Sequence, residues 1–486
     1  MKSFSFVLLV TLSCWLIGCK NEPEVNQKLN VLFIAVDDLR PELGCYGKTY
    51  MHTPNFDRLA ETGMLFENAY CSQAVCAPSR NGVMTGLRPD ALNIYNLGTF
   101  FRTQVPGVTT LSQHFKNNGY HAESLGKIYH RGHGNQDDSL SWSVKSWFPG
   151  RNQEVEAITR GDTVGLEGSY PHVDGARIAY YASEVAEEQL HDTKIADKAI
   201  ERLGQLQDSS FFLAVGFLKP HLPFVAPQKY WNFYNPDDIE IPTVQADEDL
   251  PKYSKTNWGE LRKYHAIPAE GPLNEETARG MIHGYYAAVS YIDAQLGKLL
   301  DALDSLGMSE NTVVVLWGDH GWKLGEYQDW CKHTNFELDT RSVLMMRTPG
   351  MGAKGEKSSR LAEYIDIYPS VCEAAGLPMP EHLQGKSLVP LLDEPTKVWK
   401  QVALSQYPRG TVMGYSLRNE RYRYVSWQQD KDPGQVMAEE LYDHQNDPME
   451  TNNLAGTQDS EAVLQQMRSL LDSVRQATPL VWKQYL

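Results

Sequence analysis

Two pairs of polar residues directly follow apolar stretches and could bind a metal ion together. Asp37 and Asp38 come after the stretch VLFIAV, and Asp319 and His320 come after NTVVVLWG. In open α/β sheets, ligands bind at the carboxyl ends of the strands. Each pair alone is explained more simply as a turn or a helix cap. Two such pairs at neighbouring strand ends would concentrate negative charge, which a hard cation relieves.

A cysteine adds a further reactive group. Cys76 lies in the stretch CSQAVCAPSRNGVMTG, where Pro78 suits the first turn of a helix. The free amides and the macrodipole at a helix N-terminus favour an anion near Cys76. Arg80 can turn back toward the same point. A cation is unfavourable at the N-terminal end of a helix, so the presence of Arg80 there indicates a role other than stabilising the helix. A plain thiolate nucleophile is the first functional alternative, but no Cys-His-Asn order supports it.

A parallel sheet would position these residues. The runs 31–36, 209–217 and 311–318 are continuously apolar, as expected of strands buried on both faces. Helix-patterned segments precede the second and third runs, at 192–206 and 287–307. Helices that alternate with buried strands predict a doubly wound α/β sheet.

The ends of these helices and the long connections between elements also carry signals. We expect Asp192 to be the N-cap of the first helix and Gly307 to close the second. The stretches 130–190 and 225–280 are rich in Gly, Pro, Asp and Tyr. We therefore expect them to be loop insertions over one face of the sheet.

Near residue 395 the pattern changes to the short alternating stretches QVALSQ, GYSLRN and RYRYVSW, followed by the amphipathic stretch SEAVLQQMRSLLDSVRQ. This pattern predicts a small antiparallel sheet and a helix. A chain of 486 residues is also long enough for more than one domain. We divide it into a lipoprotein-type signal peptide with its lipobox (1–19), a tether (20–27), a catalytic α/β domain (28–394) and a C-terminal α+β subdomain (395–486).

The N-terminus is typical of an export signal. Lys2 is followed by an apolar run without charge until Lys20, which is too short for a confident transmembrane span. The tetrapeptide LIGC, which ends at Cys19, resembles a bacterial lipoprotein cleavage box. It predicts lipidation of Cys19 and anchoring in the cell envelope, in the periplasm or on the outer-membrane surface. The alternative is a plain signal peptide with an incidental cysteine.

The composition restricts the class of partner and the role of the cysteines. The net charge of −16 argues against nucleic acid, or an anionic membrane face, as the main partner. Beyond the signal, the sequence contains no CxxC pair of the kind that would indicate a zinc site. Five cysteines remain there, an odd number, so at least one thiol lacks an intramolecular partner, and Cys76 is the candidate. The five are Cys45, Cys71, Cys76, Cys331 and Cys372.

Seven residues around the cysteine match a known signature: Cys76, Pro78, Ser79, Arg80, Met84, Thr85 and Gly86. They resemble the signature of the type I, formylglycine-dependent sulfatases. The resemblance covers nearly the whole chain and includes LGKIYH and WCKHTNF. The stretches AVCAPSR, TGLRPD, KPHLPF and DHGWKLGE look closest to the iduronate-2-sulfatase branch. The family implies an alkaline-phosphatase-like fold, in which helices flank a large doubly wound mixed sheet, with a smaller C-terminal antiparallel sheet and a helix.

The resemblance implies a nucleophile and a cofactor. A maturase would convert Cys76 to formylglycine (3-oxoalanine), whose hydrate attacks sulfur over one Ca²⁺ ion. A nitrogen ligand is less usual for calcium, so the identity of the metal stays open. The implied metal ligands are Asp37, Asp38, Cys76, Asp319 and His320.

The resemblance also implies roles for further residues. Arg80 would stabilise the hydrated aldehyde, and His221 would be a general acid toward the leaving oxygen. Sulfate or residue 76 would be contacted by Lys127, His130 and Lys332. Arg102 and Trp322 would shape the sugar pocket. Taken singly, each lysine or histidine is explained more simply as a solvated lysine or a packed histidine.

The expected substrate is a sulfated glycosaminoglycan oligosaccharide. An enzyme that binds a polyanion along its length needs a stripe of basic residues. The sequence shows no such stripe, which favours an exo-acting enzyme. We expect it to remove the 2-O-sulfate of a non-reducing-end uronate, unsaturated or iduronic/glucuronic, from heparan or chondroitin fragments. The alternatives are a sulfatase for another sugar position, a phosphate or phosphonate ester hydrolase of the same superfamily, and a non-catalytic glycan-binding lipoprotein.

Overall fold

The computed structural model describes residues 28–150, 172–173, 176–430 and 432–477. The expected signal peptide, Cys19 and the tether lie outside the described residues, so these stay predictions. Among the described helices, none combines the length and the apolar character that crossing a membrane requires. The five cysteines beyond the signal are all free thiols.

Strand β1 (Asn30–Val36) lies in the middle of the large sheet. It pairs in parallel with β7 (Phe211–Phe217) on one side and with β9 (Thr312–Gly318) on the other, and β3 (His121–Gly126) continues the parallel part beyond β7. Every residue of β1, β7 and β9 is buried. The three continuous apolar runs therefore form the strands that the sequence predicts.

Beyond β9 the sheet becomes mixed. Strand β13 (Leu344–Arg347) pairs antiparallel with β9 and with β2 (Met64–Tyr70). Strand β2 also pairs with β12 (Arg341–Ser342) and, in parallel, with β14 (Lys357–Glu363). The described strands thus form an eight-stranded sheet of order β12-β2-β13-β9-β1-β7-β3, with β14 beside β2.

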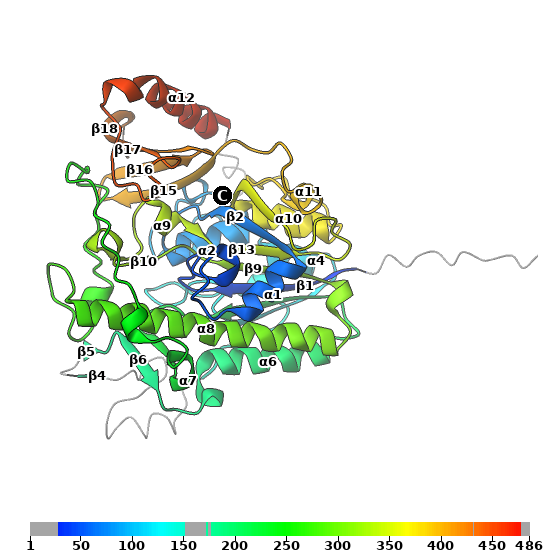
Figure 1. Ribbon diagram of the computed structural model, residues 1–486. Coiled ribbons are helices and arrows are strands. Elements are labelled where there is room, and N and C mark those ends of the chain that lie inside the picture. Colours follow the sequence, from blue (N-terminus) through cyan, green and yellow to red (C-terminus); the bar gives the residue numbers. More distant parts are fainter. Residues whose placement is uncertain (1–27, 151–171, 174–175, 431, 478–486) are drawn as a thin grey trace, which may run out of the picture.

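Helices cover both faces of this sheet (Figure 1). Leu32, Ile34 and Val36 belong to a core that also contains residues of α1 (Pro54–Thr62), α6 (His191–Gln205) and α8 (Glu275–Ser305). The alternate residues of β1 point into a second core, which contains residues of α2 (Cys76–Thr85), α4 (Leu111–Asn117) and α10 (Ile367–Ala374). This alternation confirms the doubly wound arrangement.

Two helix ends differ from expectation. Leu190, and not Asp192, is the N-cap residue of α6. The carboxylate of Asp192 instead accepts hydrogen bonds from the backbone amides of Leu218 (2.6 Å) and Lys219 (3.3 Å), so it fixes the chain that leaves β7. Helix α8 starts at Glu275, well before residue 287, and is capped by the side chain of Asn274. Gly307 follows its last turn with φ of 67°, as predicted.

A second, four-stranded antiparallel sheet lies above the large sheet in Figure 1. It consists of β15 (Ala403–Arg409), β16 (Val412–Arg418), β17 (Tyr422–Gln429) and β18 (Asp432–Asp443). Helix α12 (Glu461–Ala477) packs on it through Leu464, Met467 and Leu471. The sequence predicts three of these strands and the helix but does not single out β18.

The expected insertions contain mostly short elements. Strand β6 (Tyr180–Ser183) pairs in parallel with β8 (Phe224–Pro227), and β4 (His172–Val173) pairs with β5 (Ala176–Arg177). Helix α7 (Gln228–Trp231) also lies in the second insertion. Short elements elsewhere in the described chain include α3 (Pro89–Leu92), α9 (Glu337–Thr340), α11 (Val389–Asp393), β10 (Lys323–Leu324) and β11 (Trp330–Cys331).

Candidate active site

The structure brings the two polar pairs together at one edge of the sheet. Because β1 and β9 are parallel neighbours with Val36 opposite Gly318, the residues that follow each strand emerge side by side. The backbone N–H of Asp38 donates a hydrogen bond of 2.9 Å to Oδ1 of Asp319. Asp38 has φ of 61°, an uncommon conformation that Asp tolerates better than most residues.

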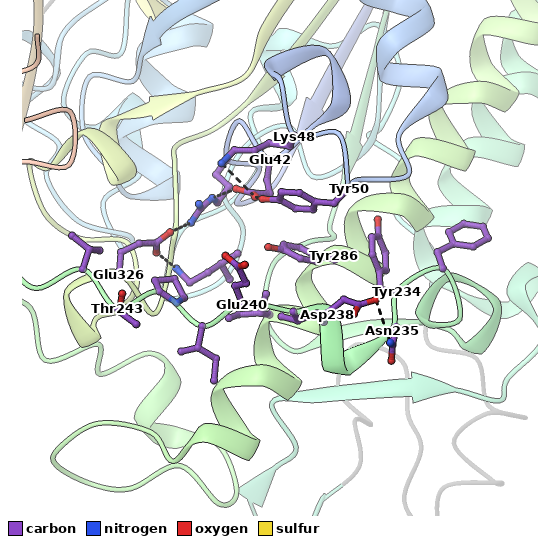
Figure 2. Close-up of a pocket in the computed structure, with 18 of the residues that line it drawn as sticks. Glu42, Lys48, Tyr50, Tyr234, Asn235, Asp238, Glu240, Thr243, Tyr286 and Glu326 are labelled. Atoms are coloured by element: carbon purple, nitrogen blue, oxygen red, sulfur yellow. Dashed lines mark hydrogen bonds and ion pairs between the residues drawn. The ribbon is translucent and has the colours of Figure 1, made fainter.

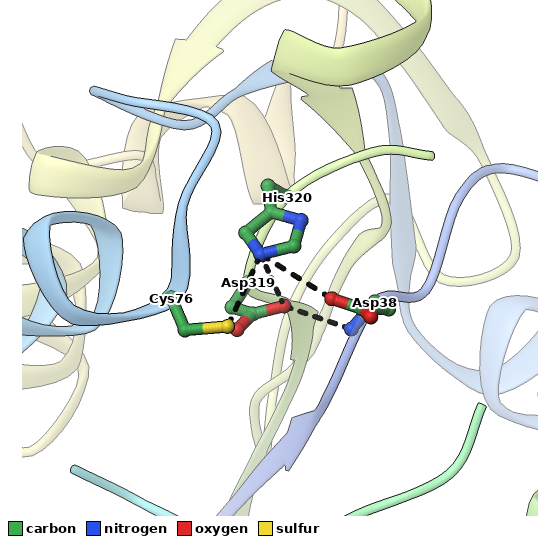
Figure 3. A group of neighbouring side chains, drawn as sticks. All are labelled: Asp38, Cys76, Asp319 and His320. Atoms are coloured by element: carbon green, nitrogen blue, oxygen red, sulfur yellow. Dashed lines mark hydrogen bonds and ion pairs between the residues drawn. The ribbon is translucent and has the colours of Figure 1, made fainter. Parts of the chain in front are cut away.

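Four side chains converge in this cluster (Figure 3). One ligand atom from each of Asp38, Cys76, Asp319 and His320 lies within 4.8 Å of the others, and all four residues are buried. His320 Nδ1 lies 3.0 Å from the carbonyl oxygen of Gly321, which can only accept, so this nitrogen carries the proton. The lone pair of Nε2 then faces Asp38 Oδ1 (3.4 Å) and Asp319 Oδ1 (3.6 Å). Such carboxylate and imidazole donors fit a divalent cation.

Cys76 is the first residue of α2 and contacts both polar pairs. Its Sγ lies 3.4 Å from His320 Nε2 and 3.6 Å from Asp37 Oδ1. Burial raises the pKa of the Cys76 thiol well above its usual range, and the charge of Lys127 opposes this shift only in part. An unmodified Cys76 is therefore a neutral thiol near neutral pH, which disfavours the plain thiolate nucleophile.

Arg80 ties the aspartates of both pairs together. Its Nε donates to Asp319 Oδ2 (2.8 Å) and its Nη2 donates to Asp37 Oδ1 (2.9 Å). The remaining Nη1 donates to the carbonyl oxygens of Lys127 (2.5 Å) and Ile128 (3.1 Å). The guanidinium is fully buried, so its position is fixed by these bonds.

Two lysines complete the charge balance. Lys127 Nζ forms an ion pair with Asp37, and Lys332 Nζ lies 2.9 Å from Asp38 Oδ1. Burial alone would raise the pKa of Asp37, but Lys127 and Arg80 hold it well below its usual value. The expected sulfate-binding lysines thus also stabilise the carboxylates.

Cys76 opens into a cavity of about 560 Å³. His130, His221 and Lys332 line it, as the proposed roles require. Burial and the charge of Lys127 lower the pKa of His130 to about 3, so this imidazole is neutral at neutral pH. Its Nε2 lies 3.2 Å from Nδ1 of His133.

Arg102 and Trp322 are not among the residues that line this cavity. Arg102 forms an ion pair with Asp138 (2.7 Å) and donates to backbone carbonyls, including that of Val108 (2.5 Å), so its guanidinium is used to hold a loop. Trp322 is fully buried, and its ring centroid lies 4.8 Å from Lys332 Nζ. Neither residue therefore shapes the cavity wall as expected. Trp322 instead contacts Lys332 through a cation–π interaction.

Glu260 is a cavity residue that the sequence did not single out. Its carboxylate lies 3.1 Å from Lys332 Nζ and 3.3 Å from His221 Nε2. Burial alone would raise the pKa of Glu260, but Lys332 and His221 hold it well below its usual value. The cavity is also lined by Arg177, Lys263 and His333, which the sequence does not single out either. The available signal was the length of the 225–280 insertion, since long loops in compact domains are usually functional.

A second cavity, of about 700 Å³, shares no lining residue with the first. Figure 2 shows its polar wall around Glu42, Lys48 and Glu326. Arg40 neutralises Glu42 and Glu326 at 2.8 Å each. None of the candidate catalytic residues is among the residues that line it.

Comparison with known proteins identifies the family. Residues 29–377 match the family described as Sulfatase, and residues 325–477 match the one described as N-sulphoglucosamine sulphohydrolase, C-terminal. The chain belongs to the sulfatase family. The iduronate 2-sulfatase of Mus musculus is 32% identical over 96% of this chain and 98% of its own length.

Solved structures agree with the sulfatase fold. The phosphonate monoester hydrolase of Agrobacterium radiobacter superposes with a TM-score of 0.76 at 24% identity, covering 93% of this chain and 96% of that one. BT1596, described as a 2-O GAG sulfatase, superposes with a TM-score of 0.67 at 23% identity and covers 93% of each chain. These likenesses confirm the alkaline-phosphatase-like architecture.

Replacement of Asp319 tests whether the cluster of Asp38, Cys76, Asp319 and His320 binds a metal ion. Asp319→Ala removes a carboxylate that also positions Arg80 and the amide of Asp38, so sulfate ester hydrolysis should fall by roughly 10²–10³-fold or more. Bound metal, measured by elemental mass spectrometry, should fall as well. His320→Asn should keep more activity, because an amide oxygen can replace the imidazole. The exposed control Asp301→Asn should keep normal activity and metal content. If Asp319→Ala also kept both, Asp319 would not belong to the site.

Replacement of Glu260 tests its place beside the cationic groups. Glu260→Gln leaves Lys332 and His221 without this counter-charge, so inorganic sulfate should inhibit roughly tenfold more strongly. The inhibition constant against a sulfate ester measures this effect. Glu270→Gln changes an exposed carboxylate of the same insertion and should leave the constant unchanged. Equal inhibition constants for the parent and Glu260→Gln would contradict the assigned charge balance.

Proposed function

We propose that this sulfatase hydrolyses the 2-O-sulfate of a uronate at the non-reducing end of glycosaminoglycan oligosaccharides. The observation that carries the sulfate ester chemistry is the buried Asp38–Cys76–Asp319–His320 cluster at a cavity lined by Lys332 and His221. The full-length similarity to an iduronate 2-sulfatase supports the uronate 2-O-sulfate.

The nucleophile would come from Cys76 after its conversion to formylglycine by a maturase. The hydrated aldehyde would supply a hydroxyl at the position of Sγ, beside the metal cluster. Arg80 holds the carboxylates of Asp37 and Asp319 on one side of this position. The neighbouring positive charges of Lys127 and Lys332 stabilise the anionic ester.

His221 would protonate the leaving oxygen. Its Nδ1 donates to the carbonyl oxygen of Leu222 (2.7 Å), which fixes the ring, and its Nε2 faces the cavity beside Glu260. A proton on Nε2 can pass to the sugar oxygen as the S–O bond breaks. The neutral His130 contributes hydrogen bonding at the same cavity without adding charge.

One Ca²⁺ ion would bind to Asp37, Asp38, Asp319, His320 and residue 76. It would supply Lewis-acid neutralisation of the sulfate oxygens and lower the pKa of the attacking hydroxyl. The donor set supports a divalent cation, with the imidazole as the ligand least typical of calcium.

An exo-acting enzyme fits the distribution of charge. A cavity of about 560 Å³ is of the size that holds a small ligand. With a net charge of −16, the cationic groups needed for the substrate are those within this cavity. We further propose lipid anchoring through Cys19, which would place the enzyme in the cell envelope, where it would trim short fragments.

A phosphate or phosphonate ester hydrolase is the second candidate, because a phosphonate monoester hydrolase shares the fold. Two-metal phosphatases need a second set of carboxylate and histidine ligands. In the described part of the chain, the other acidic groupings near Cys76 reuse Asp37 or Asp38 and include His221. This favours the sulfate ester. The complete set of catalytic groups also disfavours a non-catalytic glycan-binding role.

Variants of Cys76 test the nucleophile. Cys76→Ala lacks any group that can become an aldehyde and should abolish turnover. Cys76→Ser should do the same in a host whose maturase acts only on cysteine. Cys372→Ala is the matched control, because Cys372 is also buried but lies in α10, and it should keep activity if the protein folds. Full activity in Cys76→Ala would rule out the mechanism.

A panel of defined disaccharides tests the substrate. The enzyme should release sulfate from 2-O-sulfated uronate at the non-reducing end, and chromatography should show little or no cleavage of 6-O- or N-sulfate. Because the cavity admits a terminal sugar, internal 2-O-sulfates of long chains should be cut far more slowly. Preference for 6-O- or N-sulfate would refute the uronate specificity while leaving the sulfatase activity in place.

A further inference from the structure

The segment that carries Lys332 has an unusual backbone. Both neighbours of Lys332 adopt left-handed conformations, with φ of 69° at Cys331 and 87° at His333. Neither neighbour is a glycine, so each conformation costs free energy and persists only where the surrounding structure holds it. Strand β11 ends at Cys331, so Lys332 and His333 lie beyond the strand pairing. The position of Lys332 therefore depends on the contacts of the segment that follows.

Thr334 anchors the far end of this segment within the large domain. The Oδ2 atom of Asp339 accepts hydrogen bonds from the backbone N–H of Thr334 (2.9 Å) and from its hydroxyl (2.5 Å). The same oxygen pairs with Lys323 Nζ at 2.7 Å, and all three residues are fully buried. The peptide group of His333 thus lies between two fixed points, β11 and Thr334.

Arg409, at the end of β15 in the C-terminal sheet, holds this peptide group. Its Nη2 donates to the carbonyl oxygen of His333 at 2.5 Å. The guanidinium carbon lies 4.4 Å from the centroid of the Tyr407 ring, and this cation–π contact orients the guanidinium plane. Burial lowers the pKa of the His333 imidazole to about 3, although Glu260 opposes the shift, so this side chain is neutral. Arg409 therefore acts on the backbone next to Lys332.

The same guanidinium also contacts the insertion that carries Glu260. Nη2 of Arg409 donates to the carbonyl oxygen of Lys255 at 3.2 Å, shortly before Glu260 in the chain. Glu260 in turn forms an ion pair with Lys332 at 3.1 Å. Lys332 and Glu260 thus belong to two segments that Arg409 ties together from the C-terminal sheet.

We propose that Arg409 is a positioning residue, which acts through the carbonyl group of His333 to hold Lys332 at the sulfate-binding position beside Asp38. This inference rests on the proposed role of Lys332 toward the sulfate group, and it holds whichever sugar carries that group. Lys332 Nζ lies 2.9 Å from Asp38 Oδ1, so a small shift of its segment changes its distance to the carboxylate and to the substrate. A misplacement of about 1 Å can lower the rate roughly 10²-fold.

Variants of Arg409 in the full-length enzyme test this assignment. Arg409→Met removes the donors and keeps much of the side-chain length, and Arg409→Lys keeps a charged donor. Arg421→Met is the control, because Arg421 lies in the turn between β16 and β17 and pairs with Asp443 at 2.7 Å. Values of kcat and KM are measured on the sulfated disaccharide that the parent cleaves. The affinity for inorganic sulfate is measured by isothermal titration calorimetry.

Arg409→Met should lower kcat/KM by roughly 10–100-fold and weaken the binding of inorganic sulfate by roughly tenfold. Arg409→Lys should recover part of both, and Arg421→Met should behave as the parent. The loss should depend on Lys332: in a Lys332→Met background, Arg409→Met should change kcat/KM by less than about threefold, because the group that it positions is gone. Thermal unfolding midpoints confirm that the variants are folded. The sulfate affinity of Arg409→Met decides the inference even if Lys332→Met does not fold.

A folded Arg409→Met enzyme with unchanged kcat/KM and sulfate affinity would overturn the inference. Equal losses from Arg409→Met with and without Lys332 would also overturn it, since they would show a general structural role. A parent that cleaves no sulfate ester would instead contradict the proposed function. In that case weaker binding of inorganic sulfate to Arg409→Met than to the parent still supports the inference, and equal binding overturns it.

Discussion

Three buried carboxylates, those of Asp37, Asp38 and Asp319, occupy one small region at the ends of β1 and β9, and the arrangement around them keeps this charge tolerable. Burial without compensation would be costly for each. Arg80 spans Asp37 and Asp319, while Lys127 and Lys332 pair with Asp37 and Asp38. A divalent cation would complete the balance. In the proposed mechanism the same positive groups would also stabilise the monoanionic sulfate ester, so one set of residues would serve both stability and catalysis.

The parallel register of β1 and β9 is what allows this concentration of charge. Both strands are buried on two faces by helices, so their apolar residues fix the register, and the polar residues that follow must emerge together. Helix α2 brings Cys76 to the same edge. The C-terminal sheet contributes Arg409, which donates to the carbonyl oxygen of His333 beside the cavity.

The sequence predicts the parts of the site that depend on local pattern. Continuous apolar runs are enough to place β1, β7 and β9, and Pro78 is enough to place Cys76 at a helix start. The sequence predicts Asp192 as the N-cap of α6, which is wrong because a carboxylate near a helix start can also bind distant amides, here those of Leu218 and Lys219. Glu260, Arg177 and Lys263 carry no periodic signal, since only the packing of the insertions brings them to the cavity. The family resemblance implies that Arg102 shapes the sugar pocket, but Arg102 does not line the cavity at Cys76 and instead forms an ion pair with Asp138.

The proposed catalysis depends on one chemical fact, the identity of residue 76 in active protein. A neutral, buried thiol beside three carboxylates is a poor nucleophile, whereas an aldehyde hydrate at the same position can attack sulfur. Tandem mass spectrometry of the peptide that contains Cys76, on a preparation of measured specific activity, tests this most directly. The fraction of formylglycine should rise in proportion to activity across preparations made with and without a maturase. Full activity in protein that contains only unmodified cysteine would contradict the account.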